Sequence, residues 1–176
     1  MKYKKQNRRY GKRRWRTHAI MLLIAVGVTL AATVAAWLSE PAIGPGVANV
    51  VVYKRANCSC CHKWVTHLQD SGLVVSVQNV SSTQSIRSKL GVPDELRACH
   101  TAQVGNYWVE GHVPADLIHG LLTEQPRDVR GLAVAGMPIG SPGMEGAGAQ
   151  TYEVMRVTAE GKIELFVERQ GATSGL

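Results

Sequence analysis

Acidic side chains are missing from the start of this chain, where the first Asp or Glu is Glu40. Nine of the 20 Lys and Arg residues lie in residues 1–18, which leaves 11 against 13 Asp and Glu in the remainder. The net charge of +7 therefore belongs to a basic N-terminal arm, while the remainder carries 11 − 13 = −2. The basic composition thus gives little support for nucleic-acid binding, and no nucleic-acid partner is predicted.

Charge of either sign is missing from residues 19–38, AIMLLIAVGVTLAATVAAWL. A helix of about 20 residues, rising about 1.5 Å per residue, spans a hydrocarbon core of about 30 Å. The preceding basic arm predicts a cytoplasmic N-terminus, with residues 39–176 on the opposite side of the membrane. The segment is predicted to be a single-pass transmembrane anchor or a cleaved signal segment, with a possible cleavage site at residues 34–36.

Cysteine is also scarce, and three of the four cysteines lie within residues 58–61. A framework of disulfides that joins distant segments would space its cysteines more widely, although a membrane-tethered interaction module with structural cysteines remains an alternative. The cluster follows the apolar run 49–53 and precedes a predicted helix, so it lies at a strand-to-helix turn. There the helix dipole favours thiolate, which is both the nucleophile of disulfide exchange and a ligand of soft metals.

The order of predicted elements indicates an α/β domain. Gly105-Asn106 predicts a two-residue hairpin turn, and Pro114 opens the last helix. The complete order, β-α-β-α-β-β-α, is that of thioredoxin-like domains, in which the loop entering the third strand lies against the CxxC turn. Cys99 is therefore expected near Cys58 and Cys61. The elements are strand 49–54, a helix to about residue 70, strand 73–80, a short helix with Ile86 and Leu90, strands before and after residues 105–106, and a helix through residues 117–122.

The C-terminal third is predicted to be less regular. Residues 125–149 are rich in Gly and Pro and are expected to form a loop, packed on the domain surface, without a regular element. Residues 152–157 and 162–168 predict a terminal hairpin. The predicted organisation is a basic cytoplasmic arm (1–18), a transmembrane or signal segment (19–38), a linker (39–48), a thioredoxin-like domain (49–170) and a frayed tail (171–176).

Three separated motifs resemble the DUF411 family of bacterial metal-binding proteins, which is also called CopG-like and is associated with copper handling. The similarity covers about residues 50–167, with Ser59 where the family usually has Gly and Ala135 where it commonly has Pro. It implies a thioredoxin-like fold and Cu(I) binding through Cys58, Cys60, Cys61 and Cys99. The motifs are VVYKRANCSCCHKW, LGVPDELRACHTAQVGNYWVEGHVPADLI and GLAVAGMPIGSPGMEG.

Copper(I) prefers thiolate and thioether ligands, often only two or three of them. The crowded cysteines favour bridging thiolates that hold several ions, while a mononuclear site with two or three cysteines remains an alternative. Zinc would need a closed tetrahedral set, which His100 beside Cys99 could complete. Met137 and Met144 are candidate thioether ligands, or alternatively ordinary packing residues.

The remaining candidates have simpler interpretations. His100 is predicted as a ligand or as a group that supports one. Trp64 and Trp108 are predicted to lie in the core. The other histidines of the domain are expected to be exposed or hydrogen-bonded: His62, His67, His112 and His119.

The main alternative function is a periplasmic thiol-disulfide oxidoreductase in which Cys58 and Cys61 form the CxxC pair and Cys58 attacks. Cys60 inside the motif would form competing disulfides, and Cys99-His100-Thr101 stands where thioredoxin-like reductases usually carry a cis-proline. The sequence therefore favours an exported Cu(I)-binding protein of copper homeostasis or resistance, without catalytic residues of a conventional enzyme. Its predicted partners are copper ions and other periplasmic copper-handling proteins, and a hybrid with copper-coupled redox activity remains open.

Overall fold

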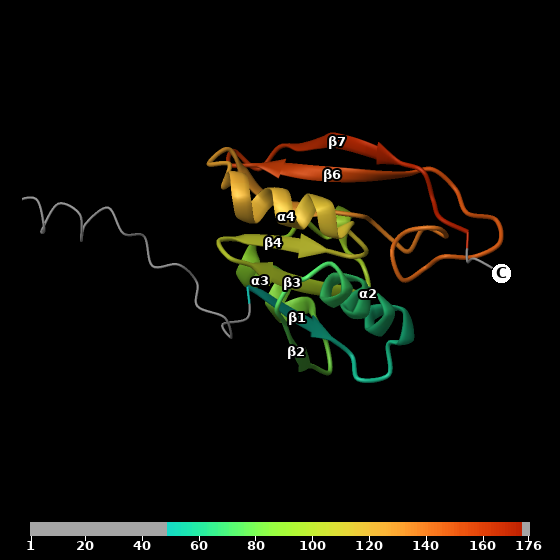
Figure 1. Cartoon of the computed structure of the whole chain (residues 1–176). Coiled ribbons are helices and arrows are strands. Elements are labelled where there is room, and N and C mark those ends of the chain that lie inside the picture. Colours follow the sequence, from blue (N-terminus) through green and yellow to red (C-terminus); the bar gives the residue numbers. More distant parts are fainter. Residues whose placement is uncertain (1–48, 174–176) are drawn as a thin grey trace, which may run out of the picture. The chain divides into compact units, whose positions relative to one another are not determined.

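A computed structural model describes residues 49–173 of the chain (Figure 1). The predicted basic arm, apolar segment 19–38 and linker lie outside the described residues, as do residues 174–176. Within residues 49–173, no helix has the length and apolar character needed to cross a membrane. The elements are β1 (Val50–Lys54), α2 (Ser59–Asp70), β2 (Val75–Asn79), α3 (Gln84–Leu90), the 3₁₀ turn η1 (Asp94–Leu96), β3 (His100–Val104), β4 (Tyr107–Glu110), α4 (Ala115–Glu124), β5 (Val129–Ala133), β6 (Tyr152–Thr158) and β7 (Ile163–Arg169).

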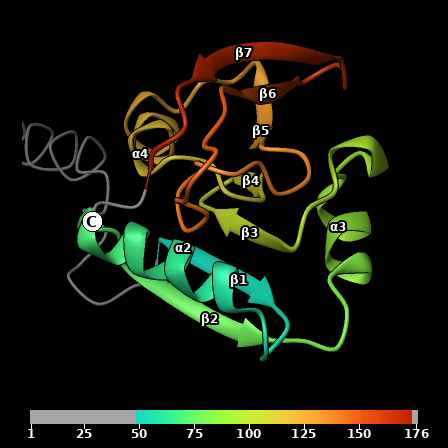
Figure 2. The same cartoon turned by 90° about the vertical axis from the view of Figure 1, so that its right-hand side faces the viewer.

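The strands of the described residues form one mixed sheet in the order β2-β1-β3-β4-β5-β6-β7. β1 and β2 are parallel, β3 is antiparallel to β1, and β4 is antiparallel to β3. The predicted order of elements from β1 to α4 is therefore confirmed. Figure 2 shows α2 and α4 on one side of the sheet and α3 on the other. The result is a three-layer α/β arrangement.

Each face of the sheet has its own hydrophobic core. On one face, Trp64 of α2 and Ile118 of α4 are fully buried against strand residues such as Val52. The Trp64 indole N–H donates to Val113 O at 2.9 Å, so its polar atom is also satisfied. On the other face, Trp108 packs with residues before β3 and on β5 and β6. The predicted core positions of the two tryptophans are confirmed.

The prediction that residues 125–149 contain no regular element is wrong, because β5 lies within them. β5 pairs parallel with β4 and antiparallel with β6, so it joins the C-terminal hairpin to the rest of the sheet. Gly131 is a packing residue here, since a Cβ at this position would overlap the Trp108 ring. The predicted terminal hairpin is confirmed as β6 and β7.

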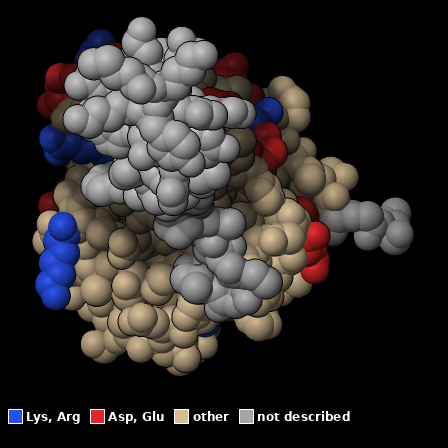
Figure 3. Space-filling view, turned by 60° about the vertical axis from the view of Figure 1, so that its left-hand side comes forward, with Lys and Arg blue, Asp and Glu red and all other residues tan. Residues whose placement is uncertain are grey.

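The end of the described chain packs against the segment that follows β5. Ala172 N–H donates to Gly140 O at 2.8 Å, and Gly146 N–H donates to Ala172 O at 3.4 Å. The tail expected to fray after residue 170 is therefore hydrogen-bonded as far as Ala172. In Figure 3, the Lys, Arg, Asp and Glu side chains that can be seen lie toward the left, upper and right margins, and the lower part of the view consists mainly of other residues.

Candidate metal centre

The first turn of α2 presents three cysteines. Cys58 is the N-cap residue, with extended backbone (φ −81°, ψ 99°) and no side-chain capping bond. Its carbonyl accepts the N–H of His62 at 3.2 Å, which closes the first helical turn. Cys60 and Cys61 follow within this turn, where backbone N–H groups lack helical partners. The helix start thus places three sulfurs close together near its positive end.

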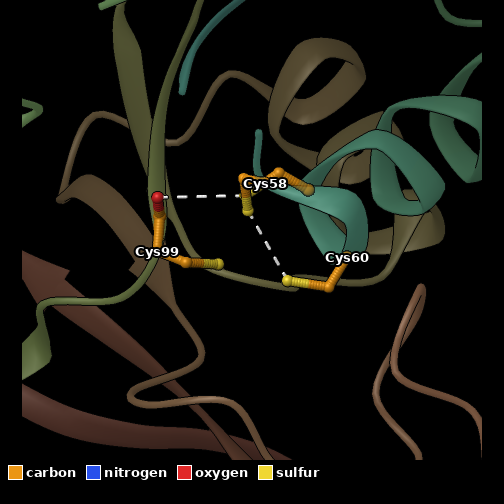
Figure 4. Close-up of side chains that lie close together, drawn as sticks. Cys58, Cys60 and Cys99 are labelled. Carbon is orange, nitrogen blue, oxygen red and sulfur yellow. Dashed lines mark hydrogen bonds between the residues drawn. A yellow bond between two sulfur atoms is a disulfide. The ribbon is translucent and has the colours of Figure 1, made fainter. Parts of the chain in front are cut away.

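The fourth cysteine reaches the same place from the loop before β3. The Sγ atoms of Cys58, Cys60, Cys61 and Cys99 all lie within 4.8 Å of one another. Figure 4 shows the labelled cysteines Cys58, Cys60 and Cys99 gathered between the start of α2 and the chain entering β3. The Cys99 carbonyl oxygen lies 3.9 Å from Cys61 Sγ. The predicted approach of Cys99 to the cysteine turn is confirmed.

Two of these sulfurs are joined in the structure. Cys58 and Cys61 form a disulfide with a Cα–Cα distance of 5.3 Å, while Cys60 and Cys99 are free thiols. Cys60 Sγ lies 3.6 Å from Cys58 Sγ. The oxidised form therefore offers two thiols, and reduction of the disulfide by two electrons and two protons would offer four.

Two buried histidines flank Cys99. His112 Nε2 lies 3.2 Å and His100 Nδ1 lies 3.3 Å from Cys99 Sγ. His112 Nδ1 lies 2.7 Å from Pro142 O, and a carbonyl can only accept, so Nδ1 carries the proton. The Nε2 lone pair of neutral His112 then points at the sulfur. A carbonyl that orients an imidazole in this way is a common arrangement behind metal-binding histidines.

The protonation of these groups follows from their burial. Burial, followed by the nearby Cys60, raises the pKa of the Cys99 thiol to about 12. Burial also lowers the pKa of His112, so the ring is held neutral. A thiol with this pKa stays protonated at neutral pH unless a cation replaces the proton. Metal uptake at Cys99 is therefore expected to release a proton.

The histidine beside Cys99 should make stability depend on acid. Burial, followed by repulsion from His112, lowers the pKa of His100 from 6.5 to about 3. Below pH 6.5 the unfolded chain binds a proton that the folded chain excludes, so stability falls as the pH drops from 6.5 toward 3. The contribution of His100 is about 1.4 kcal/mol per pH unit, or about 3 kcal/mol lost at pH 4.5. Urea unfolding at several pH values measures this loss.

His100→Phe should flatten this pH dependence, because phenylalanine keeps an aromatic ring against Trp64, whose ring centroid lies 4.2 Å from that of His100. His62→Gln provides the control, since His62 is exposed. If His100→Phe unfolds with the same pH slope as the unchanged chain, His100 is not the group responsible.

His112 is fully buried and hydrogen-bonded, within the prediction of an exposed or hydrogen-bonded histidine, but its position beside Cys99 was not predicted. A signal for it was present in the predicted hairpin. Counting outward from the Gly105-Asn106 turn pairs Thr101 with Glu110, as observed, and places Cys99 opposite His112. Cys99, His100 and His112 form a second group of candidate ligand atoms within 4.8 Å of one another. This group does not include the sulfurs of the disulfide.

The other predicted residues take varied positions. Met137 is 54% exposed and lines a cavity together with Cys99. Met144 is half-buried and follows Gly143, whose backbone lies against the first turn of α2. Both methionines remain predicted ligands. Among the histidines, His67 accepts the N–H of Ala115 at 3.1 Å, while His119 lies 3.0 Å from the carbonyl of Ser71.

Gly143 lies in the loop that carries Met137 and Met144, and it allows this loop to pack closely against the start of α2. A Cβ at this position would lie 2.9 Å from Cys60 O and 2.7 Å from Trp64 N, and φ is +84°. Gly143→Ala should therefore lower the free energy of unfolding by about 1 kcal/mol for the left-handed backbone and by a further 1–3 kcal/mol, approximately, for the overlap. Denaturant unfolding measures the loss.

Gly148→Ala is the matched control, because φ is +82° there and no atom lies within 4 Å of the added carbon. Equal decreases in the free energy of unfolding of the two variants would show that Gly143 does not pack tightly against α2.

Glu110 holds the loop that carries Cys99 through hydrogen bonds. This carboxylate is fully buried and accepts the Ala98 N–H at 2.7 Å and the Thr101 hydroxyl at 2.5 Å. Arg87 Nη1 lies 3.5 Å from it. Burial raises the pKa of Glu110, and these neighbours oppose the rise. Glu110 thus holds the backbone before Cys99 and the Thr101 side chain after it.

Comparison with known proteins agrees with this site. A family model described as "Protein of unknown function, DUF411" matches residues 96–144. A solved structure titled "Copper resistance protein copG- Form 2" is 39% identical, with a TM-score of 0.64, and the match covers 68% of this chain and 96% of that one. The chain belongs to the CopG-like DUF411 family.

A second solved structure extends the comparison. It is titled "Copper resistance protein copG- Form 1" and is 38% identical, with a TM-score of 0.64, over 69% of this chain and 97% of that one. A search of curated proteins finds no match. In this DUF411 chain, the family match includes Cys99, His100, His112 and both candidate methionines, whereas the turn with Cys58 lies before it.

The donor set of this DUF411 protein suits a soft metal. Thiol sulfurs and neutral imidazole nitrogens are ligands of soft and borderline ions, whereas Mg²⁺ and Ca²⁺ prefer oxygen. Neither group of candidate ligands within residues 49–173 includes a carboxylate. The arrangement therefore fits a role in metal binding.

Proposed function

We propose that this protein binds Cu(I) through Cys58, Cys60, Cys61 and Cys99 and acts in copper homeostasis or resistance. The observation that carries the proposal is the convergence of four sulfurs within 4.8 Å from two separate segments. The two similar solved structures are of proteins named for copper resistance, which supports copper as the metal. Copper is then cargo, and the chain works as a carrier more than as a conventional enzyme.

The proposed location and partners rest on the sequence of residues 1–38. A basic arm followed by an uncharged segment supports export, with the domain on the periplasmic side of an inner membrane, anchored or released by cleavage. Other periplasmic copper-handling proteins are the proposed partners. The fold from β1 to α4 supports a thioredoxin-like domain as the carrier.

The spacing of the sulfurs favours more than one copper ion. Cu(I) is satisfied by two or three thiolates, so four sulfurs this close can bridge several ions. His112 Nε2 is positioned to complete the set beside Cys99. Met137 and Met144 are proposed as further thioether ligands or as a cover over the cysteines.

The test is an anaerobic Cu(I) titration of the full chain in detergent against a competing chelator, with the protein reduced or oxidised. We expect tight uptake of more than one ion by the reduced protein and weaker uptake by the oxidised protein, because the disulfide withdraws two sulfurs. Weak uptake by the reduced protein would contradict the proposal.

A second candidate function is disulfide exchange, favoured by the Cys58–Cys61 disulfide at the start of α2. An exchange enzyme would reduce or oxidise a model disulfide catalytically, and this activity would survive loss of Cys60 and Cys99. A carrier would show little such activity. The two assays, run on the same preparations, separate the candidates.

A further inference from the structure

A cavity of about 490 Å³ opens beside Cys99. Its walls come from the segments that follow β1 and β5, the segment before α3, α3 itself and the loop before β3. The volume falls within the range of about 300–1,000 Å³ that is usual for small-molecule sites. The lining residues used below are Arg55, Thr83, Arg87, Arg97 and Cys99.

The lining is strongly basic. Three of the 11 Lys and Arg residues of the domain, all of them arginines, line the cavity, and none of its lining residues is acidic. Within residues 49–173, Arg55 and Arg97 are exposed and make no ion pair. The carboxylate nearest Arg87 is that of Glu110, which is fully buried and already accepts two other hydrogen bonds. Positive charge in the cavity is therefore only partly compensated.

One of the three guanidinium groups is held in place. Arg87 has a side chain that is only 11% exposed, and its Nη1 donates to Thr83 Oγ1 at 2.8 Å. Its Nε is buried and has no hydrogen-bond partner in the described part of the chain. A guanidinium that is already fixed loses little conformational entropy when it binds an anion.

The chemistry of the walls defines the ligand. Guanidinium and hydroxyl groups recognise carboxylate or phosphate oxygens, and the thiol of Cys99 recognises a soft atom. A molecule that satisfies both must carry anionic oxygens and sulfur. We propose that the cavity binds the carboxylates of an anionic low-molecular-weight thiol that brings Cu(I), and places its sulfur beside Cys99. This inference rests on the proposed Cu(I)-binding function.

Transfer in this site is a ligand exchange. The bond between Cu(I) and the incoming thiolate breaks as a bond between Cu(I) and Cys99 Sγ forms, and the ion keeps its charge. The departing thiolate takes up the proton that Cys99 loses. No oxidant or reductant is needed for this step.

The first test needs no copper. S-methylglutathione, which has two carboxylates and a capped sulfur, is titrated into the full chain in detergent by calorimetry. Arg55→Ala combined with Arg97→Ala should weaken binding at least about tenfold, because two charge-assisted contacts are lost. Arg127→Ala combined with Arg130→Ala is the matched control, because these arginines are also exposed and lie outside the cavity lining.

The outcomes of the binding test are separable. A change of less than about twofold in the control supports a local site, since long-range attraction is screened by salt. Equal weakening in the two double variants would overturn the proposal. Tighter binding of inorganic phosphate than of S-methylglutathione would also overturn it, because the site would then select phosphate.

The second test follows Cu(I) transfer to the reduced full chain by stopped flow. Cu(I)–glutathione is one donor, and Cu(I)–cysteamine, whose thiol ligand lacks carboxylates, is the other. The Arg55/Arg97 double variant should slow transfer from the first donor about tenfold and leave the second unchanged. If the unchanged chain takes Cu(I) from neither donor, the proposed function fails. If it takes Cu(I) from both and the variant slows neither, only the cavity proposal fails.

Discussion

Replacement of Cys99 by alanine is expected to weaken Cu(I) binding by about two to three orders of magnitude. Structural Zn²⁺ sites with four ligands bind with about 10–16 kcal/mol, which is about 2.5–4 kcal/mol per ligand, and we expect a Cu(I)–thiolate ligand to be worth a similar amount. Cys99 is the one cysteine that comes from outside the α2 turn, and its sulfur contacts both His100 and His112. Its loss should also break the link between the two groups of candidate ligands. Anaerobic competition with a Cu(I) chelator measures the change.

The control for Cys99→Ala is Ser59→Ala, which alters the cysteine turn without removing a sulfur. Its affinity should stay within about twofold of the unchanged chain, since Ser59 is exposed and makes no side-chain hydrogen bond within the described residues. Unchanged affinity in Cys99→Ala would mean that the turn alone holds the metal.

Replacement of Glu110 by alanine is expected to lower the free energy of unfolding by about 3–5 kcal/mol. The change removes the acceptor for the Ala98 N–H and the Thr101 hydroxyl and leaves Arg87 without its carboxylate. Buried donors without partners and a charge without its counterion are the costly consequences of such a change. Denaturant unfolding of the reduced, metal-free protein measures the loss.

Glu153→Ala is the control for Glu110→Ala, because Glu153 is exposed on β6 and should lose less than about 0.5 kcal/mol. A loss below 1 kcal/mol in Glu110→Ala would show that the Cys99 loop does not depend on this carboxylate. A loss near the expected value, together with weaker Cu(I) binding, would show that the carboxylate positions Cys99 as well as stabilising the fold.

Much of the site could be predicted because its position depends on the order of elements. Val50, Val52, Trp64 and Leu68 show the strand and helix periods clearly, and all four are fully buried. Once two parallel strands and a hairpin are inferred, the loop before β3 must lie beside the start of α2. The approach of Cys99 to the other cysteines therefore followed from topology, although it is 38 residues from Cys61.

The missed features depend on packing between distant residues. The glycines of residues 125–149 suggested a loop. Gly131 nevertheless lies in β5, and the residue there is glycine because the Trp108 ring leaves no room for a side chain. Composition alone cannot separate a glycine that packs from a glycine that turns. His112 was missed as a candidate ligand for another reason. Only its position opposite Cys99 across the hairpin makes it a candidate. Extending the predicted register by two residues would have revealed it.

Because Cys58 and Cys61 can form a disulfide, metal binding at these residues is coupled to their redox state. If the same two sulfurs serve as Cu(I) ligands, each ion bound to the dithiol form opposes disulfide formation, and linkage makes this effect reciprocal. Every tenfold gain in Cu(I) affinity of the dithiol over the disulfide form would raise the midpoint potential by about 30 mV at saturating copper. Copper binding would then make the cysteines of this turn harder to oxidise. A protein loaded with copper would keep its thiolates in surroundings that oxidise the copper-free protein.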